Sequence, residues 1–308
     1  MNTRKVGGLE VSVVGLGCNN FGTRVDQAAS ARVVHAALDA GVNFFDTADI
    51  YGTGLSETFL GRALGRQRQE VIIATKFGKP MDDERRGARP EYIRRAAEDS
   101  LRRLGTDYID LYQIHEPDPD VPILETLGAL DGLVREGKVR EIGCSNFSAA
   151  EIRDAEATSS SRGLAGFVSV QNEYSLLHRE PEAEVLDECR RIGAAFIPYY
   201  PLASGLLTGK YHLGEPAPEG SRLAGPKRSD RLTDEKLERV EALRALARER
   251  GHELLDLAFA WLLARPAVAS VIAGATKPEQ VAANAATAGW KLTEAELAAV
   301  DEVVPPGA

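Results

Sequence analysis

Four residues suited to proton transfer lie at or near the ends of short apolar runs. Asp46 ends VNFFD, Lys76 ends EVIIATK, His115 ends YIDLYQIH, and Tyr51 follows Asp46 by five residues. If Asp46 lies beside Lys76, its carboxylate offsets the penalty for burying the lysine charge, and this cation is expected to lower the pKa of Tyr51 below about 10. Such a tyrosine can protonate a developing alkoxide while His115 orients a carbonyl oxygen by a hydrogen bond. None of the four can supply a hydride, so this chemistry would require a nicotinamide cofactor.

Eight short apolar runs recur along the chain and are typical of strands buried on both faces. They end at Gly17, Asp46, Lys76, His115, Ser145, Gln171, Tyr199 and Gly274. Segments with helical spacing of apolar residues lie between them. The first seven ends are 26 to 39 residues apart, close to the roughly 30 residues of one βα repeat. We therefore predict an α/β fold, a (β/α)8 TIM barrel made by one domain over residues 1–308, with the strand-end residues at its active-site face.

An open, doubly wound sheet is the alternative fold. It normally carries G-x-G-x-x-G at the first βα turn, whereas GLGCNNFG lacks the third glycine at the required position. The segment GLLTGKY also fails as a phosphate loop, because only three residues separate its glycines. Residues 212–232 are rich in Pro, Gly and charge, which predicts a long loop that covers the cofactor. Helical patterns over 233–263, with a break at Gly251, and after Thr293 predict extra C-terminal helices.

Composition argues against several other function classes. The 308 residues include 37 Lys or Arg and 46 Asp or Glu, a net charge of −9, so general binding to nucleic acid or to an anionic membrane is not expected. Three cysteines without a C-x-x-C and histidines without ligand spacing predict neither a disulfide framework nor a metal site. The N-terminus lacks a signal-peptide core, and the most apolar stretch, 257–264, is too short to span a bilayer. We expect a soluble cytoplasmic protein.

Several motifs occur together and in order. They are FFDTADIYG followed by Ser-Glu, VIIATKFG, YIDLYQIHEPD, IGCSNFS, VQNEYS and PYYPLASGLLTGKY. Over essentially the whole chain this set resembles the aldo-keto reductase family, especially its bacterial and potassium-channel-β-subunit-like branches. The resemblance implies reversible, NADPH-dependent reduction of a small aldehyde or ketone to the alcohol. The residues that match the catalytic tetrad of the family are Asp46, Tyr51, Lys76 and His115.

The resemblance also implies which residues bind NADPH (NADP+). Those expected around the nicotinamide are Gly17, Asp46, Ser145, Asn146, Gln171 and Tyr199, the last stacking on the ring. Those expected around the pyrophosphate are Pro201, Leu202, Ser204, Gly205, Leu206 and Lys210. Those expected around the adenosine and its 2′-phosphate are Gly274, Ala275, Thr276, Lys277, Gln280 and Asn284.

Some positions depart from the family's pattern. Asn19 and Asn20 stand where many relatives have an aromatic residue, Tyr200 where Ser is usual, and Glu116 where the eukaryotic branch often has Trp. These differences predict a more polar pocket and leave the substrate open. Lys277 lies in the segment where many relatives place Arg, which predicts that NADPH is preferred but that NADH is accepted more readily than in an Arg-bearing relative.

Two other functions are compatible with parts of this pattern. Lys76 at a barrel strand end could form the imine of a Schiff-base aldolase, although a lysine paired with a carboxylate is a poor nucleophile. A redox-sensing subunit that binds the cofactor tightly and turns over slowly is the other possibility. The direction of the reaction in the cell and the oligomeric state stay open.

Overall fold

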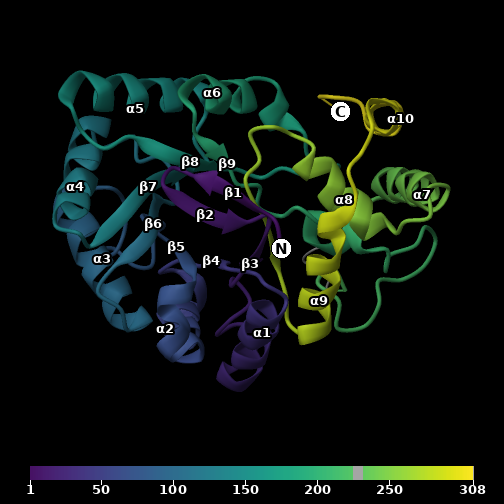
Figure 1. Cartoon of the computed structure of the whole chain (residues 1–308), viewed down its shortest axis with the longest axis horizontal. Helices are drawn as coiled ribbons and strands as arrows, with labels where there is room; N and C mark the ends of the chain where they lie inside the picture. Colours follow the sequence, from purple (N-terminus) through teal and green to yellow (C-terminus); the bar gives the residue numbers. More distant parts are fainter. Residues whose placement is uncertain (225–231, 308) are drawn as a thin grey trace.

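A computed structural model describes residues 1–224 and 232–307 of the chain. Its centre is a sheet of eight parallel strands with helices around the outside (Figure 1). In pairing order the strands are β10 (Val271–Gly274), β3 (Val14–Gly17), β4 (Phe44–Asp46), β5 (Ile72–Phe77), β6 (Ile109–Ile114), β7 (Val139–Ser145), β8 (Phe167–Gln171) and β9 (Ala195–Phe196). Phe196 closes the sheet, because its N–H donates to the Ala267 carbonyl at 2.7 Å and its carbonyl accepts from Ala269 at 3.0 Å. The predicted (β/α)8 barrel is confirmed.

Helices surround the barrel, and those near the C-terminus also pack on one another. Their bounds are α1 (Gln27–Asp39), α2 (Leu55–Leu64), α3 (Pro90–Leu104), α4 (Ile123–Arg135), α5 (Ala149–Arg162), α6 (Val185–Ile192), α7 (Asp234–Arg248), α8 (Leu254–Leu263), α9 (Pro278–Ala286) and α10 (Glu294–Val303). Short 3₁₀ turns add η1 (Tyr51–Gly54), η2 (Gly65–Glu70), η3 (Glu180–Glu182), η4 (Ala203–Thr208) and η6 (Thr287–Gly289). The break at Gly251 between α7 and α8 and the capping box of Thr293 and Glu296 occur as expected. No helix in the described ranges is both long and apolar enough to cross a membrane.

An antiparallel hairpin precedes the barrel and was not expected from the sequence. It consists of β1 (Thr3–Val6) and β2 (Leu9–Ser12). The apolar run that ends at Gly17 is therefore divided between β2 of the hairpin and β3 of the barrel. Val6, Leu9 and Val11 of the hairpin are buried against apolar side chains from the barrel interior, and Figure 1 shows the hairpin lying across one end of the barrel. The overlooked signal is Gly7-Gly8 between two short alternating runs, which is typical of a two-residue hairpin turn.

The strand expected to end at Tyr199 is shorter than the sequence indicates. β9 contains only Ala195 and Phe196, although the chain continues beside β8 through the Ile197 N–H, which donates to the Val170 carbonyl at 2.9 Å. Pro198 follows and has no N–H to contribute to a ladder. Tyr199 therefore lies in the loop beyond the strand, at the active-site end of the barrel.

Strand register aligns the polar strand ends. Gly17 of β3 is paired with Asp46 of β4, and Ser145 of β7 with Gln171 of β8. Because the strands are parallel, their carboxyl ends meet at one face of the barrel, and the side chains predicted to do chemistry gather there.

Candidate active site

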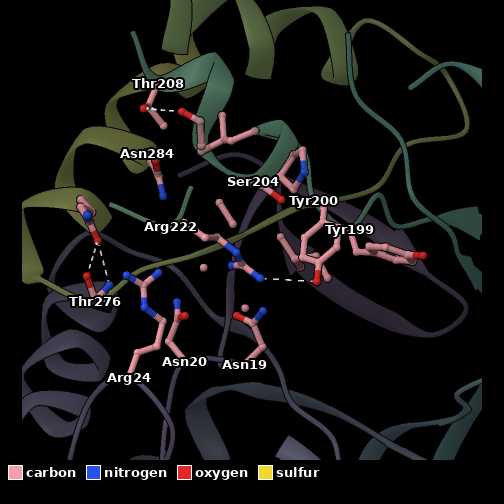
Figure 2. Close-up of a pocket in the computed structure, with 18 of the residues that line it drawn as sticks. Asn19, Asn20, Arg24, Tyr199, Tyr200, Ser204, Thr208, Arg222, Thr276 and Asn284 are labelled. Carbon is pink, nitrogen blue, oxygen red and sulfur yellow. Dashed lines mark hydrogen bonds between the residues drawn. The ribbon is translucent and has the colours of Figure 1, made fainter. Parts of the chain in front are cut away.

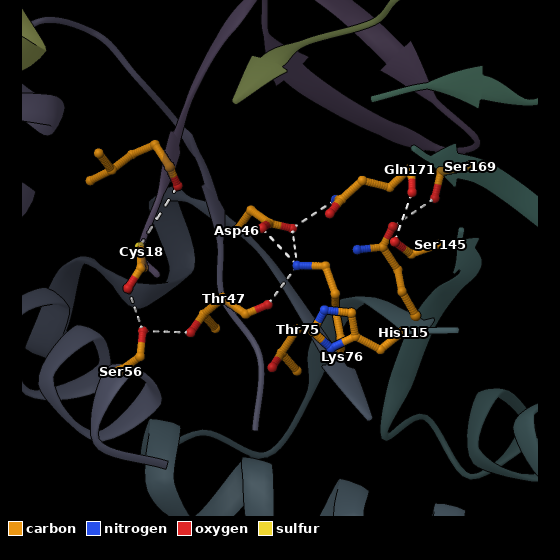
Figure 3. A network of polar contacts seen from close by, with 12 residues as sticks. Cys18, Asp46, Thr47, Ser56, Thr75, Lys76, His115, Ser145, Ser169 and Gln171 are labelled. Carbon is orange, nitrogen blue, oxygen red and sulfur yellow. Dashed lines mark hydrogen bonds and ion pairs between the residues drawn. The ribbon is translucent and has the colours of Figure 1, made fainter. Parts of the chain in front are cut away.

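The predicted proton-transfer residues come from three neighbouring strands. Asp46 is the last residue of β4, Lys76 lies in β5, and His115 directly follows β6. Figure 3 shows these three side chains converging at the ends of their strands. Tyr51 begins η1, in the loop that follows β4. The structure therefore brings together the four residues that the sequence predicts.

Lys76 and Asp46 form a buried ion pair. The Lys76 Nζ donates to Asp46 Oδ1 at 2.7 Å, to Asp46 Oδ2 at 2.8 Å and to the Thr47 carbonyl at 2.9 Å. Lys76 is 0% exposed and Asp46 3%. Gln171 Nε2 donates to Asp46 Oδ2 at 2.9 Å. The lysine charge is neutralised at close range, and its ammonium group is saturated with hydrogen bonds.

Tyr51 lies against both the ion pair and the histidine. Its ring centroid is 5.3 Å from Lys76 Nζ and 5.8 Å from the His115 ring, which it meets edge-on at 81°. Its hydroxyl makes no hydrogen bond to any residue that the structure describes. This leaves the hydroxyl available to a ligand in the cavity that Tyr51 lines.

The expected direction of the Tyr51 pKa is wrong for this structure. Burial, together with the negative charge of Asp46, raises the pKa of the phenol well above its ordinary value. The physical reason is that burial penalises the charged phenolate, and that Asp46, which holds Lys76 with both carboxylate oxygens, adds negative charge nearby. Tyr51 is therefore fully protonated at neutral pH and can act as a proton donor.

His115 is neutral in this environment. Burial, together with the positive charges of Lys76 and Lys79, lowers the pKa of the imidazole well below its ordinary value. His115 is 6% exposed, and its buried Nδ1 has no hydrogen-bond partner among the residues that the structure describes. A neutral imidazole carries one N–H, so His115 can donate one hydrogen bond to a ligand oxygen without contributing a charge.

A cavity of about 880 Å³ opens beside these residues. Of the predicted site residues, those that line it are Gly17, Asp46, Tyr51, His115, Ser145, Asn146, Gln171, Tyr199, Pro201, Leu202, Ser204, Gly205, Lys210, Gly274, Thr276, Lys277, Gln280 and Asn284. Three predicted residues do not line it. Lys76 lies behind Asp46, and Leu206 (2% exposed) and Ala275 (1% exposed) pack into the hydrophobic core, so their side chains cannot contact a ligand there.

Comparison with known proteins identifies the family. The model of the Aldo/keto reductase family matches residues 13–305. This chain belongs to the aldo/keto reductase family. It is 37% identical to the uncharacterized oxidoreductase YrpG of Bacillus subtilis (strain 168), over 97% of this chain and 94% of the relative. It is 35% identical to a probable aldo-keto reductase 1 of Glycine max, over 97% of this chain and 87% of the relative. It is 36% identical to a probable voltage-gated potassium channel subunit beta of Oryza sativa subsp. japonica, over 90% of this chain and 87% of the relative.

Amide and hydroxyl groups surround the end of the cavity nearest the buried ion pair of this aldo/keto reductase. Asn146 has a left-handed backbone (φ 62°), and its Nδ2 donates to the His115 carbonyl at 2.8 Å. Its Oδ1 accepts from the Tyr199 hydroxyl at 2.8 Å, which fixes one edge of that aromatic ring. The Ser145 hydroxyl donates to the Gln171 carbonyl at 2.7 Å. These contacts hold the predicted nicotinamide-binding residues in one place.

The predicted pyrophosphate segment forms η4 and its flanks. Ala203, Ser204 and Gly205 all have positive φ, so the backbone turns sharply beside the cavity. A Cβ added at Gly205 would lie 3.2 Å from Lys210 Nζ, which shows how closely the lysine approaches the turn. The bend places a cation and the backbone of the turn on the same wall.

The structure adds lining residues that the sequence analysis did not assign to the site. They are Arg24, Ile50, Lys79, Thr208, Leu255, Ile272, Ala273, Ala283 and the segment Pro218–Arg222, together with Asn19, Asn20 and Tyr200, which the sequence singled out only as departures. Arg24 lies in the loop after β3, where a barrel places its site residues, so its position was a usable signal. The expected long loop is present in its described part, and its residues Pro218–Arg222 line the cavity; residues 225–231 lie outside the described ranges.

Arg222 attaches the covering loop to the opposite wall. Its guanidinium lies 5.1 Å from the Tyr200 ring centroid, and its Nη2 donates to the Tyr200 hydroxyl at 3.4 Å (Figure 2). Leu223 is buried, and its N–H donates to the Tyr211 hydroxyl at 3.2 Å. Two neighbouring residues of the loop are therefore held by aromatic side chains, Arg222 by Tyr200 and Leu223 by Tyr211.

A second buried carboxyl, Asp49, lies between Asp46 and Tyr51. It is 1% exposed; its N–H donates to the Lys76 carbonyl at 3.1 Å, and its Oδ2 accepts from the Tyr92 hydroxyl at 3.4 Å. Burial, followed by the charge of Glu57, raises the pKa of Asp49 to about 7, while Arg103 acts in the opposite direction. Its Oδ1 has no hydrogen-bond partner among the described residues. Asp49 is therefore costly to ionise in the folded chain.

We expect Asp49→Asn to remove a pH-dependent loss of stability. Between about pH 4 and pH 7 the folded chain holds this proton and the unfolded chain does not, so the free energy of unfolding falls by about 1.4 kcal/mol per pH unit in that window. Urea unfolding gives the free energy of unfolding of the variant and of wild type at about pH 5 and about pH 8. The difference, variant minus wild type, should be larger at pH 8 than at pH 5 by roughly 2–3 kcal/mol. An equal difference at both pH values would contradict this expectation.

Proposed function

We propose that this aldo/keto reductase is an NADPH-dependent enzyme that reversibly reduces a small aldehyde or ketone to the alcohol. The observation that carries the proposal is the buried Asp46–Lys76 pair, with the protonated Tyr51 and the neutral His115 beside it, at one end of a large cavity. The remaining walls of the cavity suit a long anionic ligand.

Charge at the cavity fits a dinucleotide. The cations that line it are Arg24, Lys79, Lys210, Arg222 and Lys277. The carboxylates among the described lining residues are Glu219 and Asp46, and Asp46 is neutralised by Lys76. The chain as a whole carries a net charge of −9, so the cavity wall has the opposite sign to the rest of the molecule. Such a reversal favours a ligand with several phosphate groups.

The chain's own residues divide the remaining chemistry among them. A bound nicotinamide cofactor would supply the hydride, which these side chains cannot provide. His115 donates a hydrogen bond that orients the carbonyl oxygen, and Tyr51 gives its hydroxyl proton to that oxygen as the alcohol forms. In the reverse direction Tyr51 takes the proton back. Lys76 and Asp46 position the Tyr51 loop, because Lys76 bridges Asp46 and the Thr47 carbonyl at its base.

A Schiff-base aldolase is a weaker alternative on this geometry. An imine-forming lysine must reach the substrate with a free, neutral amine. Lys76 is 0% exposed, donates three hydrogen bonds and does not line the cavity. Treatment with borohydride and a carbonyl substrate, without nicotinamide, should therefore leave the protein unmodified.

The test of the proposed function is loss of 340 nm absorbance with NADPH against short aldehydes, sugars, keto acids and aryl aldehydes. We expect multiple turnovers with at least one class, and alcohol-dependent formation of NADPH in reverse. Oxidation of bound NADPH only once per protein, and slowly, would instead favour a redox-sensing subunit.

We further propose that the whole chain acts as one catalytic unit in the cytoplasm. The family match runs from residue 13 to 305. Cys18, Cys144 and Cys189 are free and buried, as is usual in a reducing compartment.

We expect NADPH to protect the covering loop from proteolysis. The contacts of its described part, residues 212–224, include Arg222 on Tyr200, the buried Leu223, and the Gly220 carbonyl, which accepts from Arg24. Trypsin should cleave after Arg222 in the cofactor-free protein, and NADPH at about 100 times its Kd should slow this cleavage by roughly tenfold or more. Equal rates with and without NADPH would rule out a cofactor-covering role.

A further inference from the structure

Arg24 projects from a tight turn that follows β3. The Arg24 N–H donates to the Asn20 carbonyl at 2.9 Å, the Val25 N–H donates to the same carbonyl at 3.1 Å, and the Gly22 N–H donates to the Val25 carbonyl at 3.0 Å. Because the backbone of residues 20–25 closes on itself, the position from which the arginine side chain starts is fixed.

This turn is packed against the segment that leads into α9. Asn20 is 5% exposed, and its Nδ2 donates to the Ala275 carbonyl at 3.3 Å. A Cβ added at Gly274 would lie 3.0 Å from Asn19 Oδ1 and 3.1 Å from Asn20 Nδ2, so glycine permits this close approach. Residues separated by more than 250 positions in the chain therefore form one continuous wall, and the cavity lining includes Arg24, Thr276 and Lys277.

The guanidinium of Arg24 has donors to spare. Its Nη2 donates to the Gly220 carbonyl of the covering loop at 3.2 Å, and within the described ranges it forms no ion pair. Figure 2 shows the side chain rising into the cavity between Thr276 and Arg222. Thr276 is less available, because both its N–H and its hydroxyl donate to Gln280 Oε1, at 2.7 Å and 3.2 Å.

We propose that Arg24 is the residue that distinguishes NADPH from NADH, by binding the 2′-phosphate together with Lys277 on the adjoining wall. The inference rests on the proposed function, and on the family resemblance, which implies that the adenosine lies beside residues 274–284. A planar guanidinium can bind two phosphate oxygens at once, whereas Lys277 supplies a point charge at the N-terminus of α9. The arginine that many relatives carry within the GA-x-x-P segment is thus replaced by one from the first βα loop. Its hydrogen bond to Gly220 also links phosphate binding to the covering loop.

The experiment measures binding of four probes to the purified full-length protein by calorimetry. The probes are NADPH, NADH, adenosine 2′,5′-bisphosphate and ADP, and the variants are Arg24→Ala, Arg24→Lys and Lys277→Ala. Arg32→Ala is the matched control, because Arg32 is exposed on α1 and does not line the cavity. Thermal melting verifies that each variant is folded.

Arg24→Ala should weaken the binding of NADPH and of the 2′,5′-bisphosphate by roughly ten- to thirtyfold. It should change the affinities for NADH and ADP by less than about twofold. The affinity of Arg24→Lys for NADPH and the bisphosphate should lie between those of wild type and Arg24→Ala. Lys277→Ala should lose less of this affinity than Arg24→Ala, and Arg32→Ala should bind as wild type does. An equal loss for all four probes would overturn the inference, since Arg24 would then act through the pyrophosphate or the loop. Unchanged binding would overturn it too, and leave the proposed function intact. If wild type bound neither dinucleotide, the proposed function itself would fail.

Discussion

Tyr51→Phe is expected to lower turnover by about 10²–10⁴-fold in both directions. The substitution removes the hydroxyl that gives the proton and keeps the ring that packs against His115 at 5.8 Å. Because burial and Asp46 raise the pKa of Tyr51, its proton is present throughout the neutral range and water is a poor substitute for it. Since the hydroxyl makes no hydrogen bond within the described part of the chain, folding stability should change by less than about 1 kcal/mol.

The measurement for Tyr51 compares kcat at 340 nm with the Kd for NADPH. The NADPH Kd should stay within about threefold of wild type, because the lost group contacts substrate rather than cofactor. Tyr108→Phe is the matched control, since Tyr108 lies outside the cavity and packs under Arg68. Wild-type turnover in the Tyr51 variant would assign the proton to another donor.

Lys76→Met is expected to abolish turnover and to destabilise the fold by about 3–5 kcal/mol. The substitution keeps an unbranched side chain one atom shorter, but both Asp46 oxygens lose their ammonium partner, and only Gln171 Nε2 still donates to the carboxylate. A buried carboxylate without a counter-charge is among the most costly single changes available to a core. The loop from Thr47 to Tyr51 also loses its anchor at the Thr47 carbonyl.

The double variant Lys76→Met with Asp46→Asn separates stability from activity. Removing both charges should recover most of the lost free energy of unfolding, because no buried charge remains unpaired. Turnover should stay undetectable if the charged pair positions Tyr51 for proton transfer. Recovery of turnover along with stability would reduce Lys76 to a structural residue. Urea unfolding and the 340 nm assay on the same preparations distinguish the two results.

Local patterns were enough to predict the barrel and the four converging side chains. Buried strands appear as apolar runs, and each βα repeat occupies a nearly constant length, so both features can be recognised without knowledge of distant contacts. A parallel barrel then gathers its strand ends at one face, which is why Asp46, Lys76 and His115 could be grouped before any distance was known. Tyr51 joined them by its place five residues after Asp46, and the family motifs added most of the cavity lining.

Tertiary structure decided the features that depend on distances between remote segments. Periodicity does not report that Asp46 holds Lys76 with both oxygens, so the direction of the Tyr51 pKa followed from the structure rather than from the residue list. Likewise, Asn20, in the same turn as Arg24, donates to the Ala275 carbonyl only because the barrel places β3 beside β10. Electrostatic energies vary with separation and burial across the whole fold, whereas sequence patterns record only which residues are buried and at what spacing.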